Sequence, residues 1–298
     1  MALLFEAKQD RCLVCDGSKL IDGGRFELED ATLRWSRCAS CGLRFQNPRI
    51  SEESIPELYS RFDYFGVHGG SEKAGYDQFT RHDSIRIAQS RRRIARITKL
   101  TSVAGGRLLD VGSASGFFGV AAREVGFDVT CVEPDKEVAA FGREKYGLTF
   151  LDRPLEHCLL QAASFDVVTV WGTDGVLLHP LHSFQQLSAA LKPGGVLALT
   201  YQDFDHPIRH LFPSIGIGWN VIYNMTDRAF DIRLRKLGMN LVAREIEWQT
   251  VTMDHVFRGA LRRPAPALLR NLLVRAPIPS VRFAVARKQL CRASRRSN

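Results

Sequence analysis

The stretch Arg107-Leu-Leu-Asp-Val-Gly-Ser-Ala-Ser-Gly116 contains the pattern that decides the fold. Its first five residues are apolar apart from Arg107 and Asp110, and they predict a short buried strand of a parallel sheet. Gly112 and Gly116 bracket a tight turn, where a Cβ would block both the backbone bend and the close approach of a ligand. The residues from Phe117 onward predict a helix. A strand, a glycine turn and a helix N-terminus together predict a nucleotide-type site at the carboxyl edge of a sheet.

A second carboxylate follows the next predicted strand. The segment Asp128-Val-Thr-Cys-Val-Glu133 ends in Glu133, which lies 17 residues after Gly116, near the spacing at which an acidic residue meets ribose hydroxyls. The turn lacks the third glycine of a dinucleotide fingerprint, and Asp110 would sit badly beside a pyrophosphate. A carboxylate at this point suits a cation, such as the amino-acid end of a sulfonium ligand. We therefore predict a cofactor site rather than a purely structural turn.

These residues resemble a known family. The segment Leu108–Gly116 is similar to the first motif of class I S-adenosylmethionine-dependent methyltransferases, and Glu133 is similar to their ribose-binding acid. Ala114 stands where the family usually has its middle glycine. Residues 164–171 and 191–200 resemble the fourth and fifth strands. The resemblance covers roughly residues 100 to 250 and implies an α/β fold with a doubly wound, seven-stranded, mostly parallel, Rossmann-like sheet.

The resemblance also implies which residues surround the cofactor. The first turn and the ends of the second, third and fourth strands would supply Asp110, Gly112, Ser113, Ala114, Gly116, Phe117, Glu133, Pro134, Asp152, Leu155 and Trp171. Adenine recognition would use either Asp152 or backbone groups near Leu155. Tyr76 belongs to an aromatic and glycine-rich stretch over residues 51–80. That stretch is either a lid whose rings cover the sulfonium or a linker packed on the core.

Four cysteines form two close pairs near the N-terminus. Cys12-Leu-Val-Cys15 and Cys38-Ala-Ser-Cys41 are separated by 22 residues, which can bring four thiolates into a tetrahedral, structural zinc shell. Four unrelated buried cysteines are the alternative. The residues between the pairs alternate like short strands, so we predict a zinc ribbon over residues 1–50. A ribbon directly before such a domain resembles the bacterial zinc-ribbon methyltransferases of sugar, polysaccharide and natural-product pathways.

The rest of the chain is divided by these motifs. We expect an aromatic lid and a linker helix over residues 51–100, a methyltransferase domain over residues 101–255, and a basic C-terminal extension over residues 256–298 that contains the last strand of the sheet. The run Arg91-Arg92-Arg93 on the linker helix predicts a solvated face, with a phosphate site as the alternative.

Composition and charge limit the location and the partners. The 298 residues carry a net charge of +9, and no apolar run approaches the ~18 residues of a membrane span. The paired cysteines favour a reducing compartment, and the first residues do not read as a signal peptide, so we expect a cytoplasmic protein. Residues 255–298 hold eleven Arg or Lys and no Asp or Glu.

Within this basic segment, residues 267–275 predict a short amphipathic helix. It would either pack on its own domain or lie on an anionic surface, which would make the protein peripheral at the inner membrane through residues 256–275.

The resemblance implies an enzyme that moves the methyl group of S-adenosylmethionine by in-line displacement to an oxygen, carbon or nitrogen. It suggests a small, sugar-linked or lipid-linked acceptor. His179 would be a proton acceptor, and the alternative is a histidine bonded to backbone at a loop corner.

Two other functions stay open. One is an RNA methyltransferase that uses the ribbon and the basic tail, although the ribbon lacks a dense basic and aromatic face. The other is a non-catalytic cofactor-binding scaffold, which Leu178 and Asn220 allow because they replace residues usual in relatives.

Overall fold

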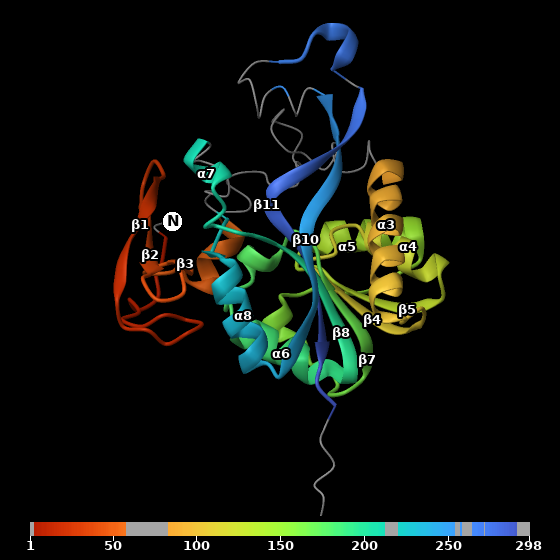
Figure 1. Cartoon of the computed structure of the whole chain (residues 1–298), viewed down its shortest axis with the longest axis horizontal. Helices are drawn as coiled ribbons and strands as arrows, with labels where there is room; N and C mark the ends of the chain where they lie inside the picture. The colour runs from red at the N-terminus through yellow and green to blue at the C-terminus, as the bar shows by residue number, and fades with distance from the viewer. Residues whose placement is uncertain are drawn as a thin grey trace, which may run out of the picture.

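A seven-stranded sheet forms the centre of the protein, and a four-stranded sheet stands beside it (Figure 1). The computed structural model describes residues 3–57, 83–211, 220–253, 257, 264–270 and 272–290. The strands of the large sheet are, in spatial order, β10 (Met239–Thr252), β11 (Leu273–Lys288), β8 (Leu191–Gln202), β7 (Phe165–Val170), β4 (Gly106–Val111), β5 (Phe127–Val132) and β6 (Thr149–Leu151). The five strands from β8 to β6 are parallel, and β11 runs antiparallel to both of its neighbours. This order confirms the predicted doubly wound, mostly parallel sheet.

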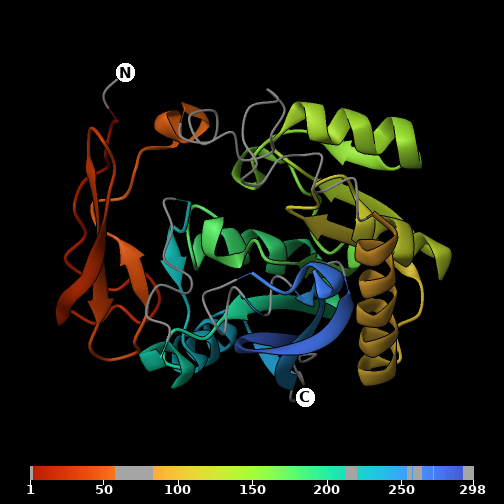
Figure 2. The same ribbon diagram turned by 90° about the horizontal axis from the view of Figure 1, so that it is seen from above.

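Helices cover both faces of the large sheet (Figure 2). The helices are α3 (Asp83–Thr101), α4 (Phe117–Glu124), α5 (Lys136–Tyr146), α6 (His182–Ala190), α7 (Ile208–Leu211) and α8 (Asp227–Lys236), and the short 3-10 turns are Glu52–Ser54, Leu155–His157, Asp174–Val176 and Ala267–Leu269. Successive residues of a strand point to opposite faces. Leu108 accordingly belongs to the core beneath α3 and α4, whereas Leu109 belongs to the core that includes α6 and α8. Burial on both faces explains why the strands are almost uniformly apolar.

Several helix ends follow from single residues. Asp135 caps α5, because its carboxylate accepts hydrogen bonds from the backbone N–H groups of Glu137 and Val138. Gly147 ends the same helix with a φ of 62°, as the sequence predicts. Thr226 caps α8 by accepting from the Ala229 N–H. These local signals account for the start of both helices and for the end of α5.

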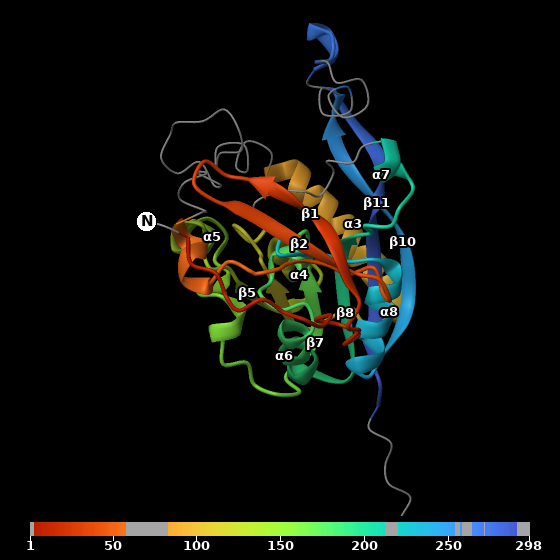
Figure 3. The same ribbon diagram turned by 90° about the vertical axis from the view of Figure 1, so that its left-hand side faces the viewer.

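The small sheet joins two distant parts of the chain (Figure 3). Its strands are β1 (Leu20–Glu27), β2 (Thr32–Cys38), β3 (Arg44–Gln46) and β9 (Tyr223–Asn224). Because β9 pairs with β3, the N-terminal segment is bonded to the chain that follows β8. Phe45 and Tyr223 are fully buried in the same core as α6 and α8. The N-terminal segment therefore packs as part of the main body on that face.

A buried ion pair lies beside this junction. Arg233 of α8 donates to Asp174 at 2.7 Å, and neither side chain is more than 3% exposed. The Tyr223 hydroxyl also donates to Asp174, at 3.4 Å. Burial raises the pKa of Asp174, and the adjacent Arg233 opposes that shift. A charge held this deep depends on its partner.

The prediction of an amphipathic helix over residues 267–275 is wrong. Only Ala267–Leu269 form a 3-10 turn, and β11 begins at Leu273, where it pairs with Thr252 of β10. The i, i+4 spacing of the leucines favours a helix, but the residues from Leu273 onward instead pair through backbone hydrogen bonds with β10. That pairing is with a strand distant along the chain, so the local sequence pattern does not show it. No helix in the described part of the chain is long and apolar enough to cross a membrane.

Replacement of Asp174 by alanine should lower the free energy of unfolding by about 3–5 kcal/mol, because Arg233 would keep its charge in the core without a partner. Urea unfolding measures this loss. The matched control is Glu124→Ala, which breaks an exposed pair with Arg91 and should cost no more than about 1 kcal/mol. Equal losses for the two variants would contradict the structural importance of the buried pair.

Candidate functional site

The predicted glycine turn lies where β4 ends and α4 begins, at the carboxyl edge of the sheet. Gly112 has a φ of 65°, and a Cβ there would come within 2.3 Å of the Thr173 hydroxyl. Gly116 has a φ of 90°, and a Cβ would come within 2.6 Å of Leu148. Glycine is required at both positions by conformation and by space. Between them Ala114 also has a positive φ, 47°, a conformation that costs an alanine about 1–2 kcal/mol.

Both predicted carboxylates lie at this edge and are almost completely buried. The Oδ1 of Asp110 accepts from the Thr169 hydroxyl at 2.7 Å, and within the described residues its buried Oδ2 has no partner. Glu133 accepts from the backbone N–H groups of Ala114 at 2.9 Å and Asp135 at 3.1 Å. Burial raises the pKa of each carboxyl to about 7, in spite of these hydrogen bonds. A cation or further donors placed here would favour the ionised forms.

A cavity of about 1550 Å³ opens beside the two carboxylates. Its lining includes most of the residues that the sequence predicts for the cofactor: Asp110, Gly112, Ser113, Ala114, Phe117, Glu133, Pro134, Leu155 and Trp171. The lining also includes residues of β10 and β11: Gln249, Thr250, Val251, Thr252 and Leu273. The cavity therefore extends from the glycine turn to the antiparallel end of the sheet.

Three of the predicted site residues that the structure describes are not part of this lining. Gly116 ends the turn and is the N-cap residue of α4. Asp152 forms an ion pair with Arg143 at 2.9 Å, which lowers the pKa of its carboxyl. His179 is half-buried with its ring centroid 5.8 Å from that of His182. Tyr76 lies outside the described residues.

The backbone around His179 is bonded to Ser183. The His179 N–H donates to the Ser183 hydroxyl at 3.3 Å, and the His179 carbonyl accepts from the Ser183 N–H at 3.2 Å. Burial and the positive charge of Arg49 lower the pKa of the imidazole, which favours its neutral form. The role of His179 as a base stays a prediction.

Arg93 is a cavity residue that the sequence analysis missed. Its side chain is 15% exposed and donates through Nε and a terminal nitrogen to Glu247, which is itself buried. The guanidinium carbon lies 4.6 Å from the centre of the Trp171 ring. The basic run was predicted to be solvated, yet Arg93 follows the buried Ser90 by three residues and precedes the buried Ile97 by four. This helical spacing was the signal that placed it on the inner face.

Trp171 forms the aromatic floor of the cavity at the end of β7. Its ring stacks on Phe283 with centroids 5.8 Å apart and an interplanar angle of 13°. Phe118 of α4 packs against it at 5.0 Å. Within the described residues the buried indole N–H of Trp171 has no partner. The packing fixes this ring in place and leaves one hydrogen-bond donor unused.

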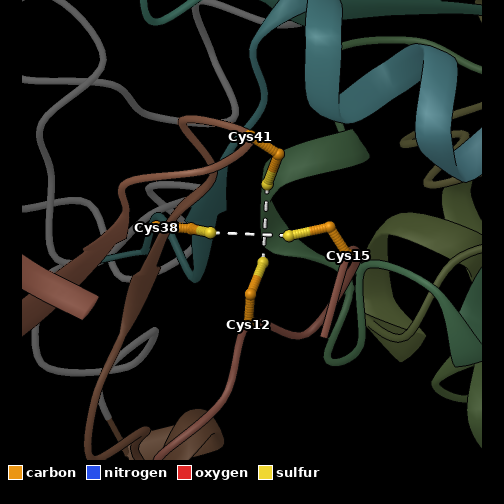
Figure 4. Close-up of side chains that lie close together, drawn as sticks. All are labelled: Cys12, Cys15, Cys38 and Cys41. Carbon is orange, nitrogen blue, oxygen red and sulfur yellow. Dashed lines mark hydrogen bonds between the residues drawn. The ribbon is translucent and has the colours of Figure 1, made fainter. Parts of the chain in front are cut away.

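The four predicted cysteines converge, with all their sulfur atoms within 4.8 Å of one another (Figure 4). The Sγ atoms of Cys12 and Cys41 are 3.5 Å apart, as are those of Cys15 and Cys38. Tetrahedral zinc with Zn–S bonds of about 2.3 Å places its sulfurs about 3.8 Å apart. The hydrogen bond from Cys41 lowers the pKa of Cys12 to about 5. The cluster therefore has the donor set and spacing that fit zinc.

Replacement of Ala114 by glycine should stabilise the protein by about 1 kcal/mol, because it removes the strain of a positive φ. The reverse change at the neighbouring turn position, Gly116→Ala, should destabilise it by more, since its Cβ would meet Leu148. Urea denaturation of both variants gives the comparison. A destabilised Ala114→Gly protein would contradict the strain assigned to this turn.

The comparisons with known proteins agree with this geometry. A family model described as a methyltransferase domain matches residues 81–243, more than half of the chain. A solved S-adenosylmethionine-dependent methyltransferase of Thermotoga maritima, a possible histamine N-methyltransferase, is 17% identical with a TM-score of 0.53 over 79% of this chain and 100% of that one.

Two further solved structures are similar. A putative methyltransferase of Bacillus halodurans is 12% identical with a TM-score of 0.51, over 66% of this chain and 98% of that one. A putative methyltransferase of Haloferax volcanii, solved in complex with the Trm112 methyltransferase activator, is 14% identical with a TM-score of 0.50. The match covers 80% of this chain and 95% of that one. No curated protein matches the chain. The chain belongs to the methyltransferase-domain family, and its fold is that of the S-adenosylmethionine-dependent methyltransferases.

Proposed function

We propose that the protein transfers a methyl group from S-adenosylmethionine, bound at the carboxyl edge of β4 and β5, to a small sugar-linked or lipid-linked acceptor. The observation that carries the proposal is the pair of buried carboxylates, Asp110 and Glu133, which open onto one cavity. The family membership supports the reaction type, and the resemblance to the zinc-ribbon group supports the acceptor class.

The two carboxylates suit the two ends of the cofactor. Asp110 has a buried oxygen without a partner in the described chain, and this oxygen can accept from the ammonium of the methionine part. Each oxygen of Glu133 already accepts one backbone N–H and keeps capacity for a ribose hydroxyl. Phe117, Pro134 and Leu155 supply apolar surface for the adenine.

Arg93 suits the carboxylate of the methionine part. Its guanidinium keeps five donors, of which two point at one oxygen of Glu247, so other donors are available for a ligand. Glu247 and the Trp171 ring hold the guanidinium in place. Asp110 and Arg93 together would therefore recognise both charges of an α-amino acid.

The cavity is large enough for two ligands. Single small-molecule sites occupy roughly 300–1,000 Å³, and this cavity holds about 1550 Å³. The half beside the glycine turn contains the carboxylates, so the half beside β10 is left for the acceptor. The β10 side of the lining includes Gln249 and Thr250, and Asn220 is a further polar lining residue; all three can hydrogen-bond to polar groups of a sugar.

The chemistry needs alignment more than acid–base groups. The sulfonium of the bound cofactor supplies an electrophilic methyl group. The chain would hold the acceptor in line with the methyl group and its sulfur atom and would exclude water. This alignment would supply most of the rate acceleration. Where the acceptor must lose a proton, His179 is the proposed base. It follows the cavity residue Leu178 directly and lies outside the lining itself, and its lowered pKa favours the neutral imidazole.

We also propose that the four cysteines bind a structural zinc ion, because four sulfur ligands leave no open coordination position. The carbonyl of Cys41 accepts from the Thr226 hydroxyl at 2.6 Å, and the same hydroxyl caps α8. Metal binding would therefore stabilise the ribbon and the start of this helix.

The affinity for S-adenosylhomocysteine should rise with pH. The free carboxyls of Asp110 and Glu133 have pKa values of about 7, so below pH 7 each must lose a proton before it can bind as an anion. Each group should contribute about a tenfold gain between pH 6 and pH 8, with a plateau above. Isothermal titration calorimetry across this range measures the effect.

Variants assign the pH dependence to its groups. Asp110→Asn should leave only the roughly tenfold gain that Glu133 contributes between pH 6 and pH 8. Glu133→Ala should weaken binding about 10- to 100-fold at pH 8 through lost ribose hydrogen bonds. Asp128→Asn, an exposed carboxyl at the other end of β5, is the matched control and should bind like the wild type. A profile that is flat in the wild type would overturn the assignment of these carboxylates.

Cys38→Ser should abolish stoichiometric zinc and lower the melting temperature by roughly 5 °C or more, because the metal ties the ribbon together. Inductively coupled plasma mass spectrometry and thermal unfolding give the two readouts. Cys158→Ser, a buried cysteine outside the cluster, should keep the zinc. Retention of zinc by Cys38→Ser would contradict the assignment.

The acceptor class can be tested with radiolabelled S-adenosylmethionine and cell extract divided into lipid, sugar and RNA fractions. Label in the lipid or sugar fraction is expected. Label in RNA alone would replace the proposed acceptor.

A further inference from the structure

The strands β10 and β11 continue beyond the rest of the sheet as a two-stranded arm (Figures 1 and 3). They pair with each other from Met239↔Lys288 to Thr252↔Leu273, whereas β8 pairs with β11 only from Val281 to Arg287. In the part of the chain that the structure describes, the arm beyond Val281 therefore has no third strand beside it. It ends in the turn Ala267–Leu269.

The end of the arm exposes large apolar side chains close together in sequence. Leu268 is 98% exposed, Leu272 52% and Leu273 44%, and Leu269 and Trp248 are also exposed. Scattered exposed leucines are ordinary on a protein surface, but a group of them on a projecting element indicates a contact with something apolar.

The same part of the arm is basic. Arg270 and Arg275 are exposed, and the guanidinium of Arg275 lies 5.5 Å from the centre of the Trp248 ring. Residues 255–298 contain no acidic residue at all. Glu247 is the one acidic residue in the described part of the arm beyond the Ile246↔Arg282 pair, and it is buried against Arg93. The exposed leucines, tryptophan and arginines therefore match an anionic lipid surface, where apolar groups enter the interface and cations meet headgroups. A second copy of the arm would instead bring two basic tips together.

The arm is also a wall of the cavity. Thr250, Thr252 and Leu273 line it, and Leu273 is at the same time one of the exposed leucines. The apolar surface at the arm is therefore continuous with the half of the cavity that the cofactor would leave free.

We propose that this arm docks the protein on an anionic lipid bilayer, so that the cavity receives an acceptor anchored in the membrane. The link to the acceptor rests on the function proposed above, but the docking itself does not. The arrangement places the apolar part of a lipid-linked acceptor along the arm and its polar part between β10 and the glycine turn.

Sedimentation of the full chain with vesicles tests the docking. Binding is expected to vesicles of phosphatidylcholine mixed with phosphatidylglycerol, to be weak for phosphatidylcholine alone, and to fall as salt rises. The double variant Leu268→Ser, Leu272→Ser should bind about tenfold or more weakly. Leu159→Ser, which changes a fully exposed leucine far from the arm, is the matched control and should bind like the wild type.

Three results would overturn the proposal. They are equal binding to neutral and anionic vesicles, undiminished binding by the double variant, or a dimer in light scattering that the double variant abolishes. If single-stranded RNA releases the protein from the vesicles, and the double variant binds the vesicles as tightly as the wild type, the arm would be assigned to nucleic acid instead. Calorimetry with S-adenosylhomocysteine separates the two proposals, because the double variant should keep full cofactor affinity. If the wild-type protein binds S-adenosylhomocysteine but not anionic vesicles, the docking is refuted. If it binds the vesicles but not S-adenosylhomocysteine, the proposed function is refuted.

Discussion

Burial of two carboxyl groups at one edge of a parallel sheet is the constraint on which the rest of the site depends. Asp110 and Glu133 are each no more than 4% exposed, and their pKa values near 7 show that burial opposes their charge. Buried groups with pKa values shifted this far cluster at functional sites. The glycine turn and the cavity are arranged around these carboxylates, and Arg93 adds the opposite charge beside Asp110.

The N-terminal segment is connected to the wall of the same cavity by a series of backbone hydrogen bonds. Gln46 of β3 donates to the carbonyl of Ile222, and Ile222 donates to the carbonyl of Gly175 at 2.8 Å. Gly175 belongs to the turn that follows β7, next to the cavity residue Thr173. The N-terminal segment is therefore joined by backbone hydrogen bonds to the turn that carries part of the cavity wall.

Local signals predicted much of this structure, and non-local contacts account for most of what they missed. The turn from Gly112 to Gly116 and the four cysteines were readable because each motif is defined by nearby residues. The pairing of β9 with β3 was not, since it joins residues about 180 apart in sequence. The strand starting at Leu273 was mistaken for a helix because only its pairing with β10 distinguishes the two. Arg93 lay on a readable helical face, but its partner Glu247 is distant in sequence.

A crystal structure with S-adenosylhomocysteine tests the central claim most directly. The account predicts the ligand at the edge of β4 and β5, with its amino group at Asp110, its carboxylate toward Arg93 and its ribose hydroxyls at Glu133. A ligand bound elsewhere, or one that leaves either carboxylate without a contact, would contradict it.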